Sequence, residues 1–428
     1  MRRNPVKADT RPSAGAPFGT YQPPSTSAPS WRPIVILCGL AVLISYVDRT
    51  NISVAAIRMQ EQFHWTETTK GYVLSSFFVG YLAMMAASGA LANRFGGRIV
   101  LGAAVIWWSL FTALTPPAAS MSFATLIAAR IALGAGEAAV FPASINMVAR
   151  WVPHEHRSRA TALFSTGLSV GTMISLPMTG WMVREYGWPV PFYVFGAMGL
   201  VWAAAWFMRV GEGRGIPEDE SAGPRVIPWK KLLSTPAVWA IFVAHFCSNW
   251  ALYVLLAWLP SYFKSTFGVT LANAGLLSAA PWAFYFIMGN LGGVTADRMI
   301  ASGRSRTFVR KLMQNTALVG SGAFLLLLPF APSATVAMLL ICGASGVISL
   351  CLSGFGANPF DVAPRYADVV WGISNTGGTM PGIIGVAVTG WLLDRTGSYN
   401  APFQLTAIVG FVGGLIYWRL ASGERLVE

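Results

Sequence analysis

Long apolar runs dominate this chain, and their length constrains its fold more than any other feature. We identify twelve, at about residues 32–56, 71–92, 98–116, 121–149, 158–183, 188–209, 236–263, 271–296, 307–330, 333–357, 367–393 and 401–420. A helix needs ~20 apolar residues to cross a bilayer, whereas strands of a membrane barrel alternate over ~10 residues. Only 11% of the residues are charged, against ~25% in soluble domains. The sequence therefore predicts an all-α polytopic membrane protein with twelve transmembrane helices.

The net charge of +13 would suit an anionic partner such as nucleic acid, but its distribution indicates another cause. Of the 30 lysines and arginines, two lie within predicted spans and five on the side opposite the N-terminus. These five are Arg58, Lys70, Arg184, Lys264 and Arg395. Such asymmetry follows the positive-inside rule. We expect no nucleic-acid partner, both termini in the cytoplasm, and a monomeric multi-pass protein of a cell membrane, namely a bacterial inner membrane.

The polar segments divide the chain into five parts. We expect a disordered cytoplasmic tail at 1–31, a six-helix half at 32–209, a cytoplasmic linker at 210–235, a second half at 236–422 and a tail at 423–428. The first tail is basic and rich in Pro, Ser and Ala, unlike a cleavable signal peptide, although a plastid transit peptide would share this bias. Thr179-Gly180-Trp181 and Thr389-Gly390-Trp391 repeat between the halves, as in transporters built from repeats around a central path.

A loop motif carries a specific resemblance. The residues from Gly89 to Arg98 resemble the signature of the major facilitator superfamily, except that Asn93 stands where an acid is usual. The chain is most similar to the anion:cation symporter family, which includes bacterial galactonate, glucarate and hexuronate transporters, animal sialin and the vesicular glutamate transporters. The matching segments are Tyr46 to Ser53, Arg130 to Pro142, Trp258 to Tyr262 and Asp361 to Thr376. The resemblance implies the major facilitator fold and alternating access.

Four ionisable residues lie deep within predicted spans: Asp48, Arg49, Arg130 and Glu137. Each charge at such depth costs ~2.5–3.5 kcal/mol or more, so it marks a functional pathway by default. On one continuous helix, Arg130 and Glu137 would share a face within ~20° and lie ~10 Å apart. A small carboxylate would fit between them. The four charges sum to zero, so a bound monoanion and one proton would restore neutrality.

These residue types suit an anion site with a proton switch. Arginine stays charged and can grip a carboxylate through two parallel hydrogen bonds, so we expect Arg49 and Arg130 to bind substrate. Removal from water favours a protonated carboxyl, whereas a neighbouring arginine favours the ionised form, so we expect Asp48 and Glu137 to couple protons. The resemblance implies the same roles. The alternative is a set of structural ion pairs, which are weak evidence of stability.

Other polar residues are candidates through the resemblance. Tyr46, Tyr81 and Asn375 match positions that line the family's cavity, although a membrane tyrosine can also be an interface anchor. The superfamily uses loop charges as gates, which makes Arg94, Arg98, Asp297 and Arg298 the candidate gate residues. We expect the half-gate that contains Asn93 to be weaker.

No motif indicates an enzyme, a metal site or a cofactor, and the expected coupling ion is a proton. His154-Glu155-His156 has the wrong spacing for a zinc-binding helix. His245 could relay protons or serve as a buried packing residue. Our leading hypothesis is proton-coupled uptake of a small organic anion, such as a sugar acid or another carboxylate. Proton-coupled efflux is an alternative, although the Gly-Pro element of efflux members is absent from the fifth span, and uniport is a third.

Overall fold

The computed structural model describes residues 31–211 and 226–427, which form helices and contain no strand. The first half contains α1 (Trp31–Phe63), α2 (Glu67–Phe95), α3 (Gly97–Met121), α4 (Phe123–Glu137), α5 (Val140–Trp151), η1 (His154–His156), α6 (Arg157–Ser165), α7 (Gly167–Tyr186) and α8 (Pro189–Arg209). The second contains α9 (Trp229–Ser234), α10 (Pro236–Phe267), α11 (Leu271–Ala301), α12 (Arg306–Leu327), η2 (Leu328–Phe330), α13 (Ala334–Ile348), η3 (Ser349–Leu352), α14 (Asn358–Val362), η4 (Pro364–Tyr366), α15 (Ala367–Thr396) and α16 (Asn400–Leu420).

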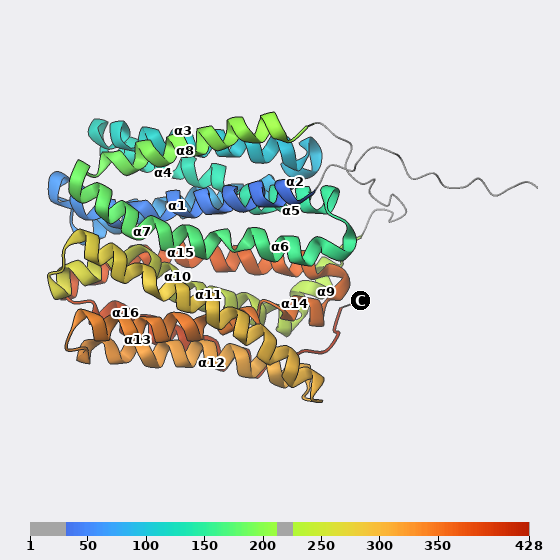
Figure 1. Ribbon diagram of the computed structural model, residues 1–428. Helices are drawn as coiled ribbons and strands as arrows, with labels where there is room; N and C mark the ends of the chain where they lie inside the picture. Colours follow the sequence, from blue (N-terminus) through green and yellow to red (C-terminus); the bar gives the residue numbers. More distant parts are fainter. Residues whose placement is uncertain (1–30, 212–225, 428) are drawn as a thin grey trace, which may run out of the picture.

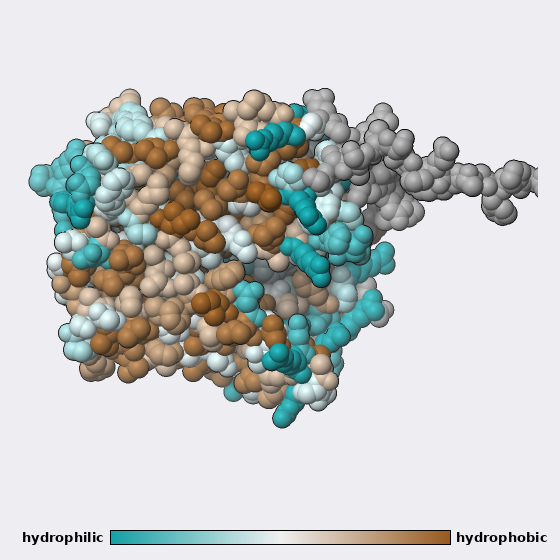
Figure 2. Space-filling model, viewed as in Figure 1, coloured by the Kyte–Doolittle hydropathy of each residue, from teal (hydrophilic) through white to brown (hydrophobic). Residues whose placement is uncertain are grey.

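Among these described residues, twelve helical segments are long and apolar enough to cross a membrane, which confirms the predicted number of spans. They form two six-helix halves that lie side by side, with α1 to α8 in one and α10 to α16 in the other (Figure 1). The face shown in Figure 2 is hydrophobic across its middle and hydrophilic at both ends. The chain enters α1 and leaves α16 at the same end of the molecule. The predicted tail at 1–31 lies outside the described residues except for Trp31, as does the linker segment 212–225.

Several spans differ from the predicted helices in detail. The fourth span is not one helix, because α4 ends at Glu137 and α5 begins at Val140. Pro142 explains the interruption, since its ring lacks an N–H and would clash with the carbonyl four residues earlier, at Ala138. The first helix continues past the predicted end at residue 56 to Phe63. A helix can continue beyond the hydrocarbon layer because its backbone is bonded internally.

The two halves are in close contact at the end of the molecule opposite the termini. There α2 packs against α15, and α7 packs against α11. A Cβ atom at Gly390 of α15 would overlap the carbonyl of Glu67 in α2, and one at Gly275 of α11 would overlap the carbonyl of Leu176 in α7. Backbone-to-backbone approach of this kind requires glycine. The pathway between the halves is therefore closed at this end.

Candidate functional site

The centre of the first half contains a buried ion pair between α1 and α4. Arg49 Nη2 lies 2.9 Å from Glu137 Oε2, and Arg49 Nε donates to the same oxygen at 3.3 Å. Ser45, one turn before Arg49 on α1, also donates to Glu137 Oε2 at 2.8 Å. Glu137 is 0% exposed and Arg49 is 6% exposed. Oε1 of Glu137 has no hydrogen-bond partner, so the carboxylate is held through one oxygen only.

Aromatic rings surround the Arg49 guanidinium. Its central carbon lies 4.6 Å from the ring centre of Tyr46, 4.8 Å from that of Phe77 and 4.9 Å from that of Tyr81. Cation–π contacts at such distances are worth ~2 kcal/mol or more when desolvated. Phe77 and Tyr81 reach the arginine because α2 and α4 approach closely at Gly134, where a Cβ atom would overlap the carbonyl of Phe77.

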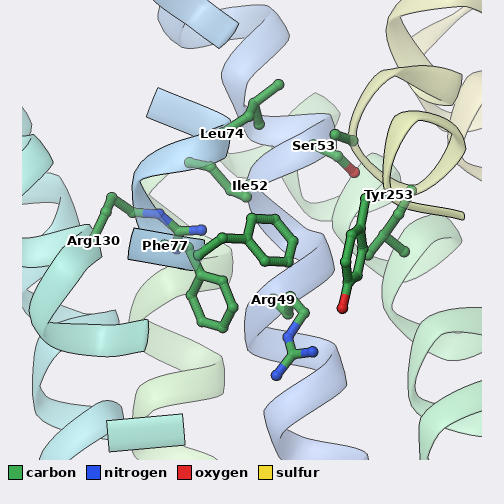
Figure 3. Close-up of a pocket in the computed structure, with 10 residues that line it drawn as sticks. Arg49, Ile52, Ser53, Leu74, Phe77, Arg130 and Tyr253 are labelled. Carbon is green, nitrogen blue, oxygen red and sulfur yellow. The ribbon is translucent and has the colours of Figure 1, made fainter. Parts of the chain in front are cut away.

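Arg130 of α4 lies on the other side of Phe77, at 5.6 Å from its ring centre. The side chain is 1% exposed, and its Nε and Nη1 atoms have no hydrogen-bond partner. Figure 3 shows it reaching from α4 toward α1, with Phe77 between the two arginines. Arg130 therefore has unpartnered donors, and Arg49 has donors that now bind Glu137. Both guanidinium groups lie beside the Phe77 ring.

A cavity of about 20 Å³ lies beside both arginines. It is lined by Arg49, Ile52, Ser53, Leu74, Phe77, Phe78, Arg130, Tyr253, Leu256 and Ala257. Because a water molecule needs ~10–15 Å³ on this measure, the cavity has room for about one water. Binding of a larger anion therefore requires the surrounding helices to separate.

Asp48 faces away from this cavity. It is 0% exposed and neither carboxyl oxygen has a partner in hydrogen-bond geometry. The side chains of Trp108 and Thr112 on α3 are its uncharged neighbours, and Arg130 and Glu137 act on it electrostatically. The structure thus places all four predicted charges in one region, with Arg49 and Glu137 paired and Asp48 on a different side of α1.

The uncharged candidates are divided between two places. Tyr46 and Tyr81 contact Arg49, as described above. Asn375 of α15 instead donates to Met85 Sδ of α2 at 3.0 Å, which is a contact between the halves. Ser45 and Phe77 were missed by the sequence reasoning. A signal for Ser45 was its spacing of four residues from Arg49, which places both on one face of a helix.

The structure does not bring the four gate candidates into ion pairs with one another. Arg94 lies 5.3 Å from the ring centre of Phe95, and Arg98 donates to the carbonyl of Val210 at 2.5 Å. Asp297 and Arg298 belong to the last turns of α11. Asn93, the departure from the superfamily motif, accepts a hydrogen bond from Asn146 at 3.3 Å. Their role in gating stays a prediction.

His245 and the His154-Glu155-His156 segment both pack against other side chains. His245 Nδ1 lies 2.8 Å from Ser374 Oγ, and its ring stacks on Phe355 at 4.4 Å between centres. His156 stacks on Trp31 at 5.4 Å. No group of three or more metal-ligating side chains occurs in the described parts of the chain.

A polar network joins the halves at the closed end. Asp394 of α15 accepts hydrogen bonds from the backbone N–H groups of Glu67 and Thr68 at 2.9 and 2.8 Å. These groups lie in the first turn of α2, where N–H groups have no partner within the helix. Lys70 is 2% exposed, pairs with Glu67 at 2.6 Å and lies 4.9 Å from the ring centre of Trp258 on α10. Asp394 and Trp258 of the second half therefore hold α2 of the first.

Replacing Asp394 with alanine is expected to open this end. Loss of an N-terminal cap costs ~1 kcal/mol, so the population open at this end should rise about fivefold. A cysteine placed at Ser53, which lies beneath the closure, would react correspondingly faster with a membrane-impermeant thiol reagent. Arg395→Ala is the matched control, because Arg395 packs on Trp391 of its own helix. Equal labelling rates in the wild type and Asp394→Ala would show that the cap does not hold the closure.

Comparison with known proteins identifies the architecture. The model of the Major Facilitator Superfamily matches residues 38–385. The chain is 37% identical to "Probable anion transporter 4, chloroplastic" of Oryza sativa subsp. japonica, over 92% of this chain and 69% of that protein. It is 36% identical to "Ascorbate transporter, chloroplastic" of Arabidopsis thaliana, over 92% and 75% of the two chains. It is 37% identical to "Sodium-dependent phosphate transport protein 1, chloroplastic" of the same plant, over 92% and 80%.

Solved structures agree in fold. A bacterial homologue of the human lysosomal transporter Spinster, inward-facing and occupied, superposes with a TM-score of 0.75 at 18% identity, covering 92% of this chain and 97% of that one. A D-xylose–proton symporter gives 0.70 at 14% identity, covering 92% and 99%. The relatives are named as transporters, not enzymes, and their names give an anion, ascorbate and phosphate as what they carry. The resemblance found in the sequence is thereby confirmed, and the chain is a multi-pass membrane transporter that belongs to the major facilitator superfamily.

Proposed function

We propose that this transporter takes up a small organic anion together with a proton by alternating access, and that the anion is a sugar acid or another carboxylate. The observation that carries the proposal is the buried pair of Arg49 and Glu137 beside the cavity. Arg49 is the proposed anion-binding group and Glu137 the proposed proton-binding group. When the substrate anion binds Arg49, it breaks the ion pair between Arg49 and Glu137. Competition for that contact is a physical means of coupling.

The coupling follows from the geometry of the pair. A substrate carboxylate that accepts two hydrogen bonds from Arg49 displaces Glu137 Oε2, which now holds both Nε and Nη2. The displaced carboxylate would be a buried charge with only Ser45 as donor, a state that costs several kcal/mol. Taking up a proton removes this cost. Release of the anion returns Arg49 to Glu137 and expels the proton.

Arg130 supports binding of a second anionic or polar group. Its unpartnered donors face the same region as Arg49, separated by the Phe77 ring. A substrate that contacts both arginines must either displace the Phe77 ring or place its own apolar face against that ring. We therefore assign Arg49 to the carboxylate and Arg130 to a further acceptor on the substrate.

Inorganic phosphate is a second candidate substrate. Two arginines at one cavity suit an ion with several acceptor oxygens, and one relative at 37% identity is named a phosphate transport protein. The same relative is named sodium-dependent, so the coupling ion has to be tested along with the anion.

Uptake into proteoliposomes tests the proposal. The panel comprises gluconate, ascorbate, glutamate and inorganic phosphate, each measured with no gradient, with an inward proton gradient and with an inward sodium gradient. We expect one carboxylate to accumulate only under the proton gradient. Equal uptake with and without gradients would indicate uniport. Accumulation driven by sodium alone, or none of any anion, would refute proton-coupled uptake.

The orientation and the membrane are part of the same proposal. The excess of Lys and Arg on the side of the termini supports cytoplasmic termini through the positive-inside rule. The asymmetry does not identify the membrane. The relatives named above are chloroplast proteins, so a bacterial inner membrane stays a proposal. The site lies within one chain, so a monomer suffices for transport, and we propose no cofactor besides the proton.

A further inference from the structure

Buried polar atoms without partners are concentrated in three helices, one of which, α1, carries Asp48. Ten of the seventeen such side-chain atoms found among the described residues belong to α1, α3 and α4. They are carried by Asp48, Asn51, Trp108, Ser109, Thr112, Arg130 and Glu137. Buried polar groups in native proteins are nearly always hydrogen-bonded, so a group of exceptions needs a functional explanation.

The location of Asp48 separates it from the substrate cavity. Arg49 lines that cavity, and Asp48 does not. Consecutive residues of a helix point ~100° apart, so the aspartate is directed to another side of α1. Trp108 and Thr112 of α3 act on its carboxyl, and the backbone of Trp108 packs against Gly136 of α4, the residue before Glu137. Trp108 and Thr112 are four residues apart and therefore share one face of α3, and both are 0% exposed.

The side chains of Trp108 and Thr112 differ in the hydrogen bonds that they can form with Asp48. The indole N–H of Trp108 can only donate, so it stabilises the ionised carboxylate. The hydroxyl of Thr112 can donate to the carboxylate or accept from the neutral acid. Neither meets hydrogen-bond geometry in this conformation, and a buried carboxylate without donors is costly. The observed arrangement therefore suits the neutral acid, and ionisation requires these donors to turn toward it.

We propose that Trp108 and Thr112 are positioning residues for Asp48, which hold its carboxyl in a compartment apart from the substrate cavity and determine how readily it releases its proton. The inference rests on the proposed proton coupling. Arg130 and Glu137 of α4 are the charged groups that act on Asp48 across this compartment. The charged residues of α3, α7 and α8 lie near the helix ends, at Arg98, Arg184, Glu185 and Arg209.

Infrared titration of the reconstituted full-length protein, without any substrate, tests whether Trp108 and Thr112 determine the protonation of Asp48. The carboxyl C=O band that disappears in Asp48→Asn reports the protonation of Asp48. In Thr112→Val the midpoint of this band should move upward by about one pH unit, equivalent to about 1.4 kcal/mol, because the ionised form has lost a donor. Trp108→Phe should move it in the same direction. Thr112→Ser keeps the hydroxyl and should titrate as the wild type does.

Thr115→Val is the matched control. Thr115 is buried on the same helix and bonds only the carbonyl of Phe111, at 2.8 Å, so its loss should leave the midpoint unchanged. Wild-type midpoints in both Thr112→Val and Trp108→Phe would overturn the inference, as would the absence of any titrating band that Asp48→Asn removes. A midpoint that sodium chloride displaces, but potassium chloride does not, would indicate a cation site and also overturn it. Proton-driven uptake by the wild type is measured separately, so failure of the proposed function remains distinguishable.

Discussion

Replacing Arg49 with alanine is expected to abolish anion transport, with uptake at least ~100-fold below that of the wild type. Removing one partner of a buried, hydrogen-bonded charge pair costs ~2–5 kcal/mol, and 2.8 kcal/mol corresponds to about 100-fold in affinity. Arg49 provides the paired donors that now hold Glu137, and the proposed substrate uses the same donors. Arg49→Lys should also be severely impaired, because an ammonium group keeps the charge and loses the planar fork.

A second variant separates loss of binding from loss of folding. Arg49→Ala leaves Glu137 buried without its ion-pair partner, whereas the double variant Arg49→Ala/Glu137→Gln contains neither charge. The double variant should recover thermal stability and remain unable to bind the anion. Arg184→Ala is the control, since Arg184 is exposed and pairs with the neighbouring Glu185. Wild-type uptake by Arg49→Lys, or restored uptake by the double variant, would argue against direct contact between Arg49 and the anion.

Replacing Glu137 with glutamine should uncouple transport from the proton gradient. Glutamine retains an oxygen that can accept from Ser45 and Arg49 but cannot take up a proton. Exchange of labelled for unlabelled anion should therefore stay within about fivefold of the wild type, since a neutral acceptor bond is worth ~1 kcal/mol. Gradient-driven accumulation should fall to the level of protein-free liposomes. Both assays, anion exchange and gradient-driven accumulation, are measured on the same proteoliposome preparation.

The control for this variant is Glu185→Gln, which neutralises an exposed acid near the end of α7 and should leave both activities intact. Full accumulation by Glu137→Gln would mean that the proton is carried elsewhere. Asp48→Asn would then be the next variant to measure, because Asp48 is the other acid buried deep in the predicted spans.

The sequence predicted the fold well because apolar length is a local property. Each span could be found from its own residues, and the four charges stood out because so few ionisable groups occur at depth. Lys70 shows where this reasoning fails. The sequence placed it only among the cations on the side opposite the N-terminus, whereas in the structure it is 2% exposed because Trp258 of the second half covers it. Burial by a distant segment leaves no signal in the neighbouring residues.

The internal arrangement of the site depends on the rotation of helices about their axes, which spacing within one helix does not fix. The seven-residue interval between Arg130 and Glu137 suggested a slot for substrate between them. In the structure Glu137 is the last residue of α4 and bonds Arg49 of α1 instead. Ser45 and Phe77 complete this arrangement from two other directions.

The interruption after Glu137 also bears on how the molecule can move. On the side of the chain termini, the fourth span continues as the short α5, the fifth begins as the short α6, and the tenth ends in η3. The helices α10 and α15 run through to the closed side as single helices of 32 and 30 residues, each with one internal proline, at Pro260 and Pro381. Where the ladder of backbone hydrogen bonds is already broken, bending removes few further bonds. We therefore expect the terminal side to bend at these three breaks as it opens and closes.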